Sequence, residues 1–359
     1  MVKKERNSNI ELFRIIVMLL IVAHHYVLGY GSLMHDTPLT AQSWFLYFWG
    51  MWGKTGINCF VLITGYYMCK SDITLHKFLK LFLEIEFYAL VIYLIFVLTG
   101  YIDFQWGDLI ITMWPIHNVD SGFVSGFLLY FLFIPFINVL VRNLTQKYHQ
   151  LLILLSVTVY TLLAKISDLG GVNITLSLNY ITWFSIIHII ASYIRFYPPK
   201  KENDTHFWGL YTFISVVLSM MSVVAVRLTG MGAYFFVSDS NAPFALLTSI
   251  CAFMLFKSMK VKQSKLINTI AATTFGVLLI HTHSSTMRQW IWHDLLQNED
   301  VFGTSMCVLH AIFSVLAIFI VCAFIDWLRR LTIEDVLIDV VKKPIQKVLK
   351  KKNEDKQKQ

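Results

Sequence analysis

The chain has 359 residues, of which 56% are hydrophobic and only 14% are charged, and its formal net charge is +8. Soluble domains rarely have so few charged residues, so the composition argues against a soluble fold. Most of the positive charge lies in short segments between apolar stretches, which makes a nucleic acid a poor choice of partner.

The apolar residues form ten blocks that are long enough to cross the hydrocarbon core of a bilayer as helices. In chain order the blocks are residues 10–30, 54–70, 78–99, 121–141, 149–165, 179–197, 207–228, 243–259, 269–287 and 304–328. The sequence therefore predicts an all-α fold, a polytopic membrane bundle of about ten transmembrane helices within residues 1–328.

Lysine and arginine predict the orientation of this bundle. If the N-terminus is cytoplasmic, the segments on the opposite side hold only Lys54, Lys165, Arg227 and Arg288, and the cytoplasmic segments hold most of the others. This asymmetry is the positive-inside pattern of membrane proteins. Both termini are therefore predicted to be cytoplasmic.

Residues 329–359 are predicted to be a separate, basic cytoplasmic tail. Apolar residues recur there at helical spacing, and Lys342, Lys343 and Lys347 lie on the opposite face. A helix of this kind typically lies on an anionic membrane surface. Just before the tail, a surface ion pair with the arginines that follow is enough to explain Asp326.

The first block contains two groups that are costly to bury in a membrane, Arg14 and His25. Eleven residues at about 100° each return to nearly the same helix face, after a rise of about 16 Å. An ionisable side chain inside a membrane marks a candidate functional site. Neutral imidazole is the usual general base near neutral pH, and a guanidinium suits a phosphate or a carboxylate. We therefore predict that His25 is the catalytic base and that Arg14 is the second catalytic residue.

Two neighbours of these groups leave alternatives open. His24 points about 100° away from His25 and is the second candidate for the base. Glu11 lies one turn before Arg14, and an internal Glu11–Arg14 ion pair would explain the arginine without any ligand.

The second and third blocks hold further candidates. Around Asn58 and Thr64, small and hydroxyl residues allow the close approach of a helix or a ligand, and packing alone would explain them. Lys77 and Lys80 open the third block on one face, where they either snorkel to lipid headgroups or hold a phosphate-rich ligand. Glu84, four residues after Lys80, is expected to neutralise it.

The remaining histidines in the apolar blocks and the cysteines are weaker indicators of a functional site. His188, His281, His283 and His310 lie within or near later blocks, where hydrogen-bonded core histidines are the more common explanation. The five cysteines are scattered without metal-ligand spacing, so we expect no metal site and interpret them as small apolar packing residues. The sequence contains no Walker loop, GxSxG motif, zinc motif or dinucleotide fingerprint.

Five segments carry a likeness to one family. They are Glu11 to Arg14 with ten further residues before His25, GINCFVLITGYYM with Thr64 in place of the usual serine, FLLYFLFIPFIN with Pro135 and Asn138, IIASYIRFY with Arg195, and TTFGVLLIHTHSSTMRQWIWHDLL with His281. Together they resemble the bacterial membrane proteins often called acyltransferase family 3, which include polysaccharide O-acetyltransferases. The likeness covers essentially all ten blocks. The family commonly has an Arg-x-x-Arg sequence at the third block, where this chain has Lys77 and Lys80.

The resemblance implies an integral membrane O-acyltransferase in the cytoplasmic membrane of a bacterial cell. Acyl-CoA, in the first place acetyl-CoA, would be a co-substrate, and no cofactor would stay bound. The donor phosphates would lie near Arg14, Lys77 and Lys80, and the acceptor would be a hydroxyl of a cell-surface or extracellular glycan or of its lipid-linked precursor. Supporting roles would fall to Glu11, His24, Asn58, Thr64, Arg195 and His281. The chain could also form a homo-oligomer.

Two other functions would use the same chain differently. A transporter or exporter of a glycan precursor or small anion would use Arg14 and His25 to bind substrate or to relay protons. Such proteins more often show repeat symmetry and broken helices in matching halves, and the sequence shows no such repeat. A non-catalytic membrane scaffold would explain the apolar blocks but not Arg14 and His25.

Overall fold

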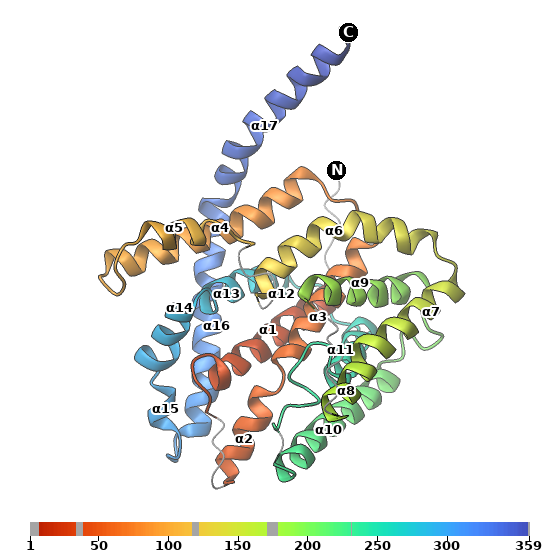
Figure 1. Cartoon of the computed structure of the whole chain (residues 1–359), viewed down its shortest axis with the longest axis vertical. Coiled ribbons are helices and arrows are strands. Elements are labelled where there is room, and N and C mark those ends of the chain that lie inside the picture. Colours follow the sequence, from red (N-terminus) through yellow and green to blue (C-terminus); the bar gives the residue numbers. More distant parts are fainter. Residues whose placement is uncertain (1–6, 34–38, 117–121, 171–178, 231, 358–359) are drawn as a thin grey trace.

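The computed structural model describes residues 7–33, 39–116, 122–170, 179–230 and 232–357, and within these ranges it is helical and contains no strand. The helices are α1 (Ser8–Leu28), α2 (Ala41–Gly50), α3 (Gly53–Met68), α4 (Leu75–Leu98), α5 (Trp106–Thr112), α6 (Phe123–Asn143), α7 (Gln146–Val157), the π-helical segment η1 (Thr158–Leu163), α8 (Ala164–Gly170), α9 (Tyr180–Phe196), α10 (Thr205–Leu228), α11 (Pro243–Ser258), α12 (Lys265–Ala271), α13 (Thr274–His281), α14 (Ser285–Gln289), the π-helical segment η2 (Trp290–Leu295), α15 (Asn298–Val301), α16 (Cys307–Thr332) and α17 (Glu334–Gln357). Figure 1 shows their arrangement.

The described helices agree with a polytopic membrane protein. Six helical segments are long and apolar enough to cross a bilayer: α1, α4, α6, the continuous run from α7 to α8, α10 and α16. A seventh span results if α12–α13 and α14–η2 are counted as one, although the two parts are bent by 99° at a short break. Helices α9 and α11 are apolar but have only 17 and 16 residues. Ten spans, and the cytoplasmic position of both termini, stay predictions.

Helix α1 lies at the centre of the bundle. It packs against α2, α3, α11, α12, α13 and α16. Its buried side chains include Phe13, Val17, Ile21 and Val22, which point in several directions around the helix axis. A helix that is apolar on all sides suits such a central position. The placement of α1 therefore determines where the polar groups near its end, His24 and His25, can lie.

Helix α3 approaches its neighbours closely because it carries glycine at the contacts. A Cβ atom on Gly56 would lie 2.7 Å from the Ile21 side chain of α1, and one on Gly65 would lie 3.0 Å from the Cα atom of His188 in α9. The first distance is shorter than real Cβ contacts, and the second is tighter than most of them, so a larger residue at either position would force its neighbour to shift. This confirms the packing explanation for the small residues of the second block.

Three features of the fold differ from the sequence-based prediction. Helix α2 lies outside the ten predicted blocks, and it begins at a capping box in which Thr40 and Ser43 satisfy each other's backbone N–H groups. The ninth block is not one helix but a bent series, α12 to α14. Helix α16 continues to Thr332, so the predicted boundary at residue 329 falls inside a helix.

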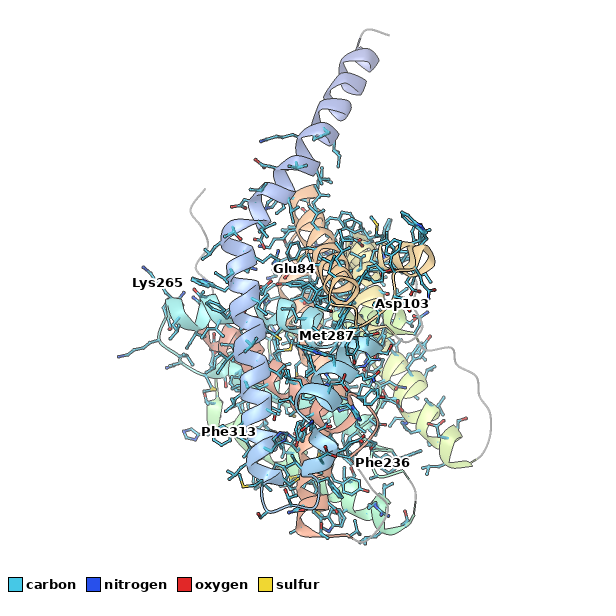
Figure 2. All side chains as sticks on the ribbon, turned by 90° about the vertical axis from the view of Figure 1, so that its left-hand side faces the viewer. Glu84, Asp103, Phe236, Lys265, Met287 and Phe313 are labelled. Atoms are coloured by element: carbon cyan, nitrogen blue, oxygen red, sulfur yellow. The ribbon has the colours of Figure 1, made fainter. Side chains whose placement is uncertain are left out.

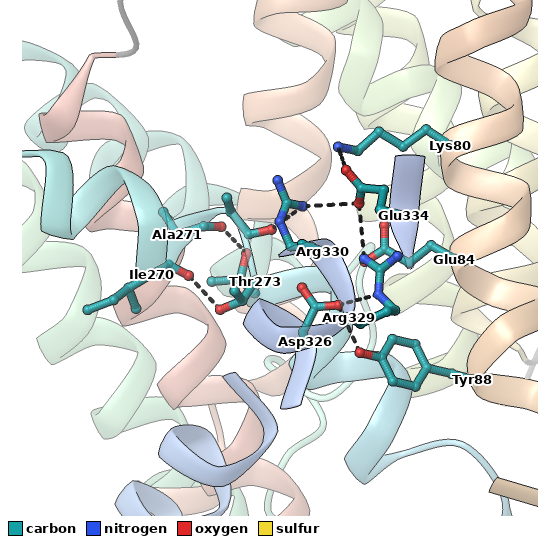
Figure 3. Close-up of polar contacts among 12 residues, drawn as sticks. Lys80, Glu84, Tyr88, Ile270, Ala271, Thr273, Asp326, Arg329, Arg330 and Glu334 are labelled. Carbon is teal, nitrogen blue, oxygen red and sulfur yellow. Dashed lines mark hydrogen bonds and ion pairs between the residues drawn. The ribbon is translucent and has the colours of Figure 1, made fainter. Parts of the chain in front are cut away.

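A buried ion-pair cluster joins α4 to α16 (Figure 3). Arg329 contacts Glu84 at 3.0 Å and Asp326 at 2.8 Å, and the Tyr88 hydroxyl donates to the same Asp326 oxygen at 2.8 Å. Asp326 is 0% exposed and Arg329 is 4% exposed. The prediction of a surface ion pair at Asp326 was therefore wrong, because α13 packs on α16 with Gly276 against Asp326, and α4 adds the Tyr88 side chain. Glu84 pairs with Arg329 rather than with Lys80, which contacts Glu334 instead.

The first residue of α17 extends this cluster. Glu334 contacts Lys80 at 2.6 Å, Arg329 at 3.2 Å and Arg330 at 3.7 Å. Burial raises the pKa of Glu334, but the contacts from Lys80 and the two arginines outweigh it and hold the pKa below its usual range. The carboxylate is therefore charged at neutral pH. Beyond this junction α17 extends away from the helical body, and Figure 2 shows Glu84 beside α16 close to that junction.

Substituting the central arginine should destabilise the protein strongly. Arg329→Met removes the cation that compensates Glu84 and Asp326, and leaving buried carboxylates uncompensated costs about 3–5 kcal/mol. Thermal unfolding of the purified protein in detergent would measure the loss. Lys343→Met is the matched control, because its ion pair with Asp339 is exposed and is worth less than about 1 kcal/mol. Similar small changes in both variants would contradict a stabilising role for the cluster.

Candidate active site

A cavity of about 800 Å³ opens where the last turns of α1 meet the start of α3. Its walls also come from α4, α5, the beginnings of α6 and α9, and the break between α13 and α14. Its charged and titratable lining residues are His24, His25, Lys54, Tyr93, Asp108, Tyr180, His283 and Arg288. The volume lies in the range typical of small-molecule sites, and the polar groups converge on it from separate helices.

His25, which lines the cavity, forms a directed pair with the buried His281. His25 Nδ1 lies 3.1 Å from His281 Nε2, and His281 Nδ1 lies 2.6 Å from the carbonyl oxygen of Val277. A carbonyl can only accept, so His281 carries its proton on Nδ1 and presents an unprotonated Nε2. His25 therefore donates from Nδ1, and in its neutral form its own Nε2 carries a lone pair. That nitrogen has no partner among the described residues, and the histidine lines the cavity.

His24 lines the same cavity but is held differently. Its Nδ1 donates to the carbonyl oxygen of Gly50 at 2.5 Å, and its ring stands edge-on to that of His25 with the centroids 5.3 Å apart. A Cβ atom on Gly53 would lie 2.3 Å from the His24 ring, so glycine at the start of α3 makes room for this histidine. The two adjacent histidines thus have separate partners, as their helical positions predicted, yet both reach the cavity.

Two cations also line the cavity. Lys54 donates from Nζ to the Tyr180 hydroxyl at 2.9 Å, and Arg288 donates from Nη1 to the carbonyl oxygen of Thr282 at 3.4 Å. Both side chains are half-buried. Sequence reasoning noted these cations only as exceptions to the positive-inside pattern. That exception is the one signal that could have drawn attention to them.

Arg14 does not line this cavity. It lies near the other end of α1, where its guanidinium is 3.9 Å from the carboxylate of Glu11. The internal ion pair that the sequence left open is therefore present. The shared helix face of Arg14 and His25 does not bring the two residues together, because about 16 Å of helix rise separates them.

Lys77 and Lys80 lie at the start of α4, away from the cavity lining. Lys77 donates to the Ser71 hydroxyl at 2.5 Å and to the Asp72 carbonyl at 2.7 Å. Lys80 is held by Glu334 at the start of α17. The structure does not place these lysines near His25.

Three other predicted site residues make contacts inside the bundle. Asn58 donates to the carbonyl oxygen of Ser240 at 2.7 Å and accepts from the indole of Trp183 at 2.9 Å. Thr64 donates to the Phe60 carbonyl oxygen at 2.9 Å within α3. Arg195 donates to the hydroxyl of Tyr66 at 2.7 Å and stacks over its ring. Unlike these three residues, the predicted supporting residue His281 contacts His25 directly.

The described residues contain no cluster of side chains suited to a metal ion. All five cysteines are buried and free, as the sequence predicted. Among the described lining residues, the groups available for chemistry are histidines, two cations, tyrosines and the carboxylate of Asp108.

A protein-family model described as an acyltransferase domain matches residues 7–327 of the chain. No curated protein and no solved structure matches it. The matched region includes the entire cavity and every helix that lines it.

The hydrogen bonds of the histidines predict which of them react with diethyl pyrocarbonate, a reagent that modifies unprotonated imidazole nitrogens. His24 and His25 should be modified, because each presents a free Nε2 to the cavity. His188 and His281 should stay unmodified, because both nitrogens of each ring are hydrogen-bonded and both residues are 0% exposed. Peptide mass spectrometry would measure the labelling, and equally fast reaction of His188 would contradict the arrangement.

Proposed function

The chain belongs to acyltransferase family 3, and on that premise we propose that it moves an acetyl group from acetyl-CoA to a hydroxyl of a cell-surface or extracellular glycan or of its lipid-linked precursor. The chain is an acyltransferase with several helices able to cross a membrane. The observation that supports the proposal best is that His25 lines a cavity large enough for a sugar and is hydrogen-bonded to the buried His281 behind it.

In the proposed reaction His25 is the general base. Its Nε2 takes the proton of the acceptor hydroxyl while the oxygen attacks the thioester carbonyl of acetyl-CoA. The tetrahedral intermediate then collapses, the carbon–sulfur bond breaks, and the thiolate of CoA leaves. The imidazolium returns its proton to that thiolate, so the histidine ends the cycle neutral. The same nitrogen could instead carry the acetyl group as a covalent intermediate.

His281 is a positioning residue in this scheme. Its hydrogen bond to the Val277 carbonyl selects the tautomer that accepts from His25. That in turn selects the tautomer of His25 whose basic nitrogen is free. The arrangement keeps the imidazole in one orientation without adding a negative charge to the site.

The donor is proposed to arrive from the cytosol, where acetyl-CoA is made, and to leave its phosphates near Arg14, Lys77 and Lys80. The contact between Lys80 and Glu334 supports this placement, because the Glu334 carboxylate shows that Lys80 is positioned to bind an oxyanion. Phosphate oxygens are acceptors of the same kind and would compete with that carboxylate. Lysine provides a point charge rather than a bidentate fork, so this site would recognise charge more than shape.

Replacing the proposed base should abolish acetyl transfer. His25→Ala should lower the rate by about 10²–10⁴-fold, the usual contribution of a general base. His281→Gln should reduce the rate less, because it only disturbs the orientation of His25. Release of free CoA from acetyl-CoA by the protein in nanodiscs, with and without an oligosaccharide acceptor, would measure both effects.

His206→Gln is the control for this experiment, since His206 is exposed at the start of α10, away from the cavity. It should behave like the parent protein. Full activity in His25→Ala would exclude the assignment, and loss only in a His24 variant would transfer it to His24. Substrate movement across sealed vesicles without CoA release would favour a transporter.

Donor binding can be tested with two variants that are expected to change the affinity for CoA in opposite directions. The double variant Lys77→Gln, Lys80→Gln should weaken CoA binding by about tenfold, because it removes charged hydrogen-bond donors. Glu334→Gln should bind CoA at least as tightly as the parent, because it releases Lys80 from its carboxylate. Calorimetry with purified protein measures both, with the exposed Lys262→Gln as control. Unchanged affinity in the double variant would place the phosphates elsewhere.

A further inference from the structure

Lys54 and Arg288 stand out because they line the cavity without an acidic partner among the described residues. The hydrogen-bond acceptors of these two cations are neutral, a tyrosine hydroxyl for Lys54 and a backbone carbonyl for Arg288. Elsewhere in the described chain, the well-buried cations Lys165, Lys257 and Arg329 each contact a carboxylate. Lys54 and Arg288 differ from these three cations in having only neutral acceptors, as the half-buried Arg195 also does.

Holding an unpaired cation in a partly desolvated site costs free energy, and proteins usually offset that cost with a counter-charge. Among the described residues, Asp108 is the only carboxylate on the cavity lining, and it is exposed on α5. Asp108 forms no ion pair with Lys54 or Arg288. Even if its negative charge is counted, the two cations leave the described lining with a net positive charge. The missing counter-charge is best supplied by a ligand.

We propose that Lys54 and Arg288 bind a carboxylate or phosphate group of the acceptor, so that the cavity selects a negatively charged sugar. This inference rests on the proposed function of the cavity and names the class of its acceptor. Arg288 offers the planar fork that suits a carboxylate, and Lys54 adds a point charge that the Tyr180 hydroxyl holds in place. The neighbouring hydroxyl of the same sugar then faces His25.

The position of the two cations favours the acceptor over the donor as the source of the anion. Lys54 lies at the start of α3 and Arg288 on α14, and both belong to the few basic residues that the positive-inside pattern assigns to the side away from the cytosol. The donor phosphates enter from the cytosolic side in the proposed reaction. An extracytoplasmic glycan reaches these cations first.

The test compares two acceptor probes that differ only in charge, a disaccharide containing glucuronic acid and its counterpart with glucose. Acetyl transfer from acetyl-CoA is followed for the parent protein and for Lys54→Gln and Arg288→Gln. Losing a charged hydrogen bond should lower kcat/KM for the acidic disaccharide by about 10- to 100-fold. The neutral disaccharide should be affected much less, and the exposed Lys265→Gln should behave like the parent with both probes.

Reversing the charge at position 288 should create a new acceptor preference rather than only a loss of activity. Arg288→Glu should reverse the preference toward a disaccharide containing glucosamine, which a purely structural role of the arginine would not produce. Equal losses with the acidic and the neutral probe, or a parent protein that prefers the neutral probe, would overturn the proposal. A raised KM for acetyl-CoA, with unchanged selectivity between the acceptors, would instead assign the two cations to the donor phosphates.

Direct binding separates this inference from the proposed function. Calorimetry with the acidic and neutral disaccharides needs no catalysis, and the parent protein should bind the acidic one more tightly, with the difference lost in Arg288→Gln. If that difference is present while no acetyl transfer occurs, the anion site stands and the reaction is wrong. If transfer occurs and no difference in binding or selectivity is found, the reaction stands and the anion site is wrong.

Discussion

Every buried polar group in this bundle must find its partner inside the protein, because a bilayer offers no water to replace one. Arg329 meets that requirement with two buried carboxylates and the start of α17 (Figure 3). His188 meets it with Tyr130 and Asn138. His25 meets it only on one side, through His281. A few other buried atoms, such as His149 Nδ1 and Trp292 Nε1, also lack a hydrogen-bond partner among the described residues. His25 differs from these two residues because it lines the cavity, where a substrate can supply the missing partner.

The break between α13 and α14 creates this situation. Because the two segments are bent by 99°, α13 ends at His281 beside α1, while α14 turns away and presents Arg288 to the same cavity. A straight helix would have carried one of the two residues past the site. Broken helices inside a membrane are tolerated where they line a polar cavity, and here the break lies on the cavity wall.

Charge is distributed unequally between the two ends of α4. At its start, Lys80 shares Glu334 with Arg329 and Arg330, so that cations and carboxylates there are matched. Around the cavity near its other end, the cations lack acidic partners among the described residues. The matched end fastens α17 to the bundle, and the unmatched end is suited to recognising a ligand. The same residue types therefore stabilise the fold at one end and are available for binding at the other.

Apolar length and periodicity in the sequence were enough to predict a polytopic helical protein and most of its long helices. The unusual depth of His25 was enough to single it out, since burying an ionisable group needs a reason. Local pattern could not predict that the ninth block bends, that Asp326 is covered by α13, or that Arg14 stays with Glu11 while His281 joins His25. These outcomes depend on which helices meet, and contacts between residues far apart in the chain leave no periodic trace. The sequence determined most of the long helices and one candidate base. The tertiary structure decided the partners of that base, because hydrogen bonds and charge pairs across helices exist only once the helices are packed.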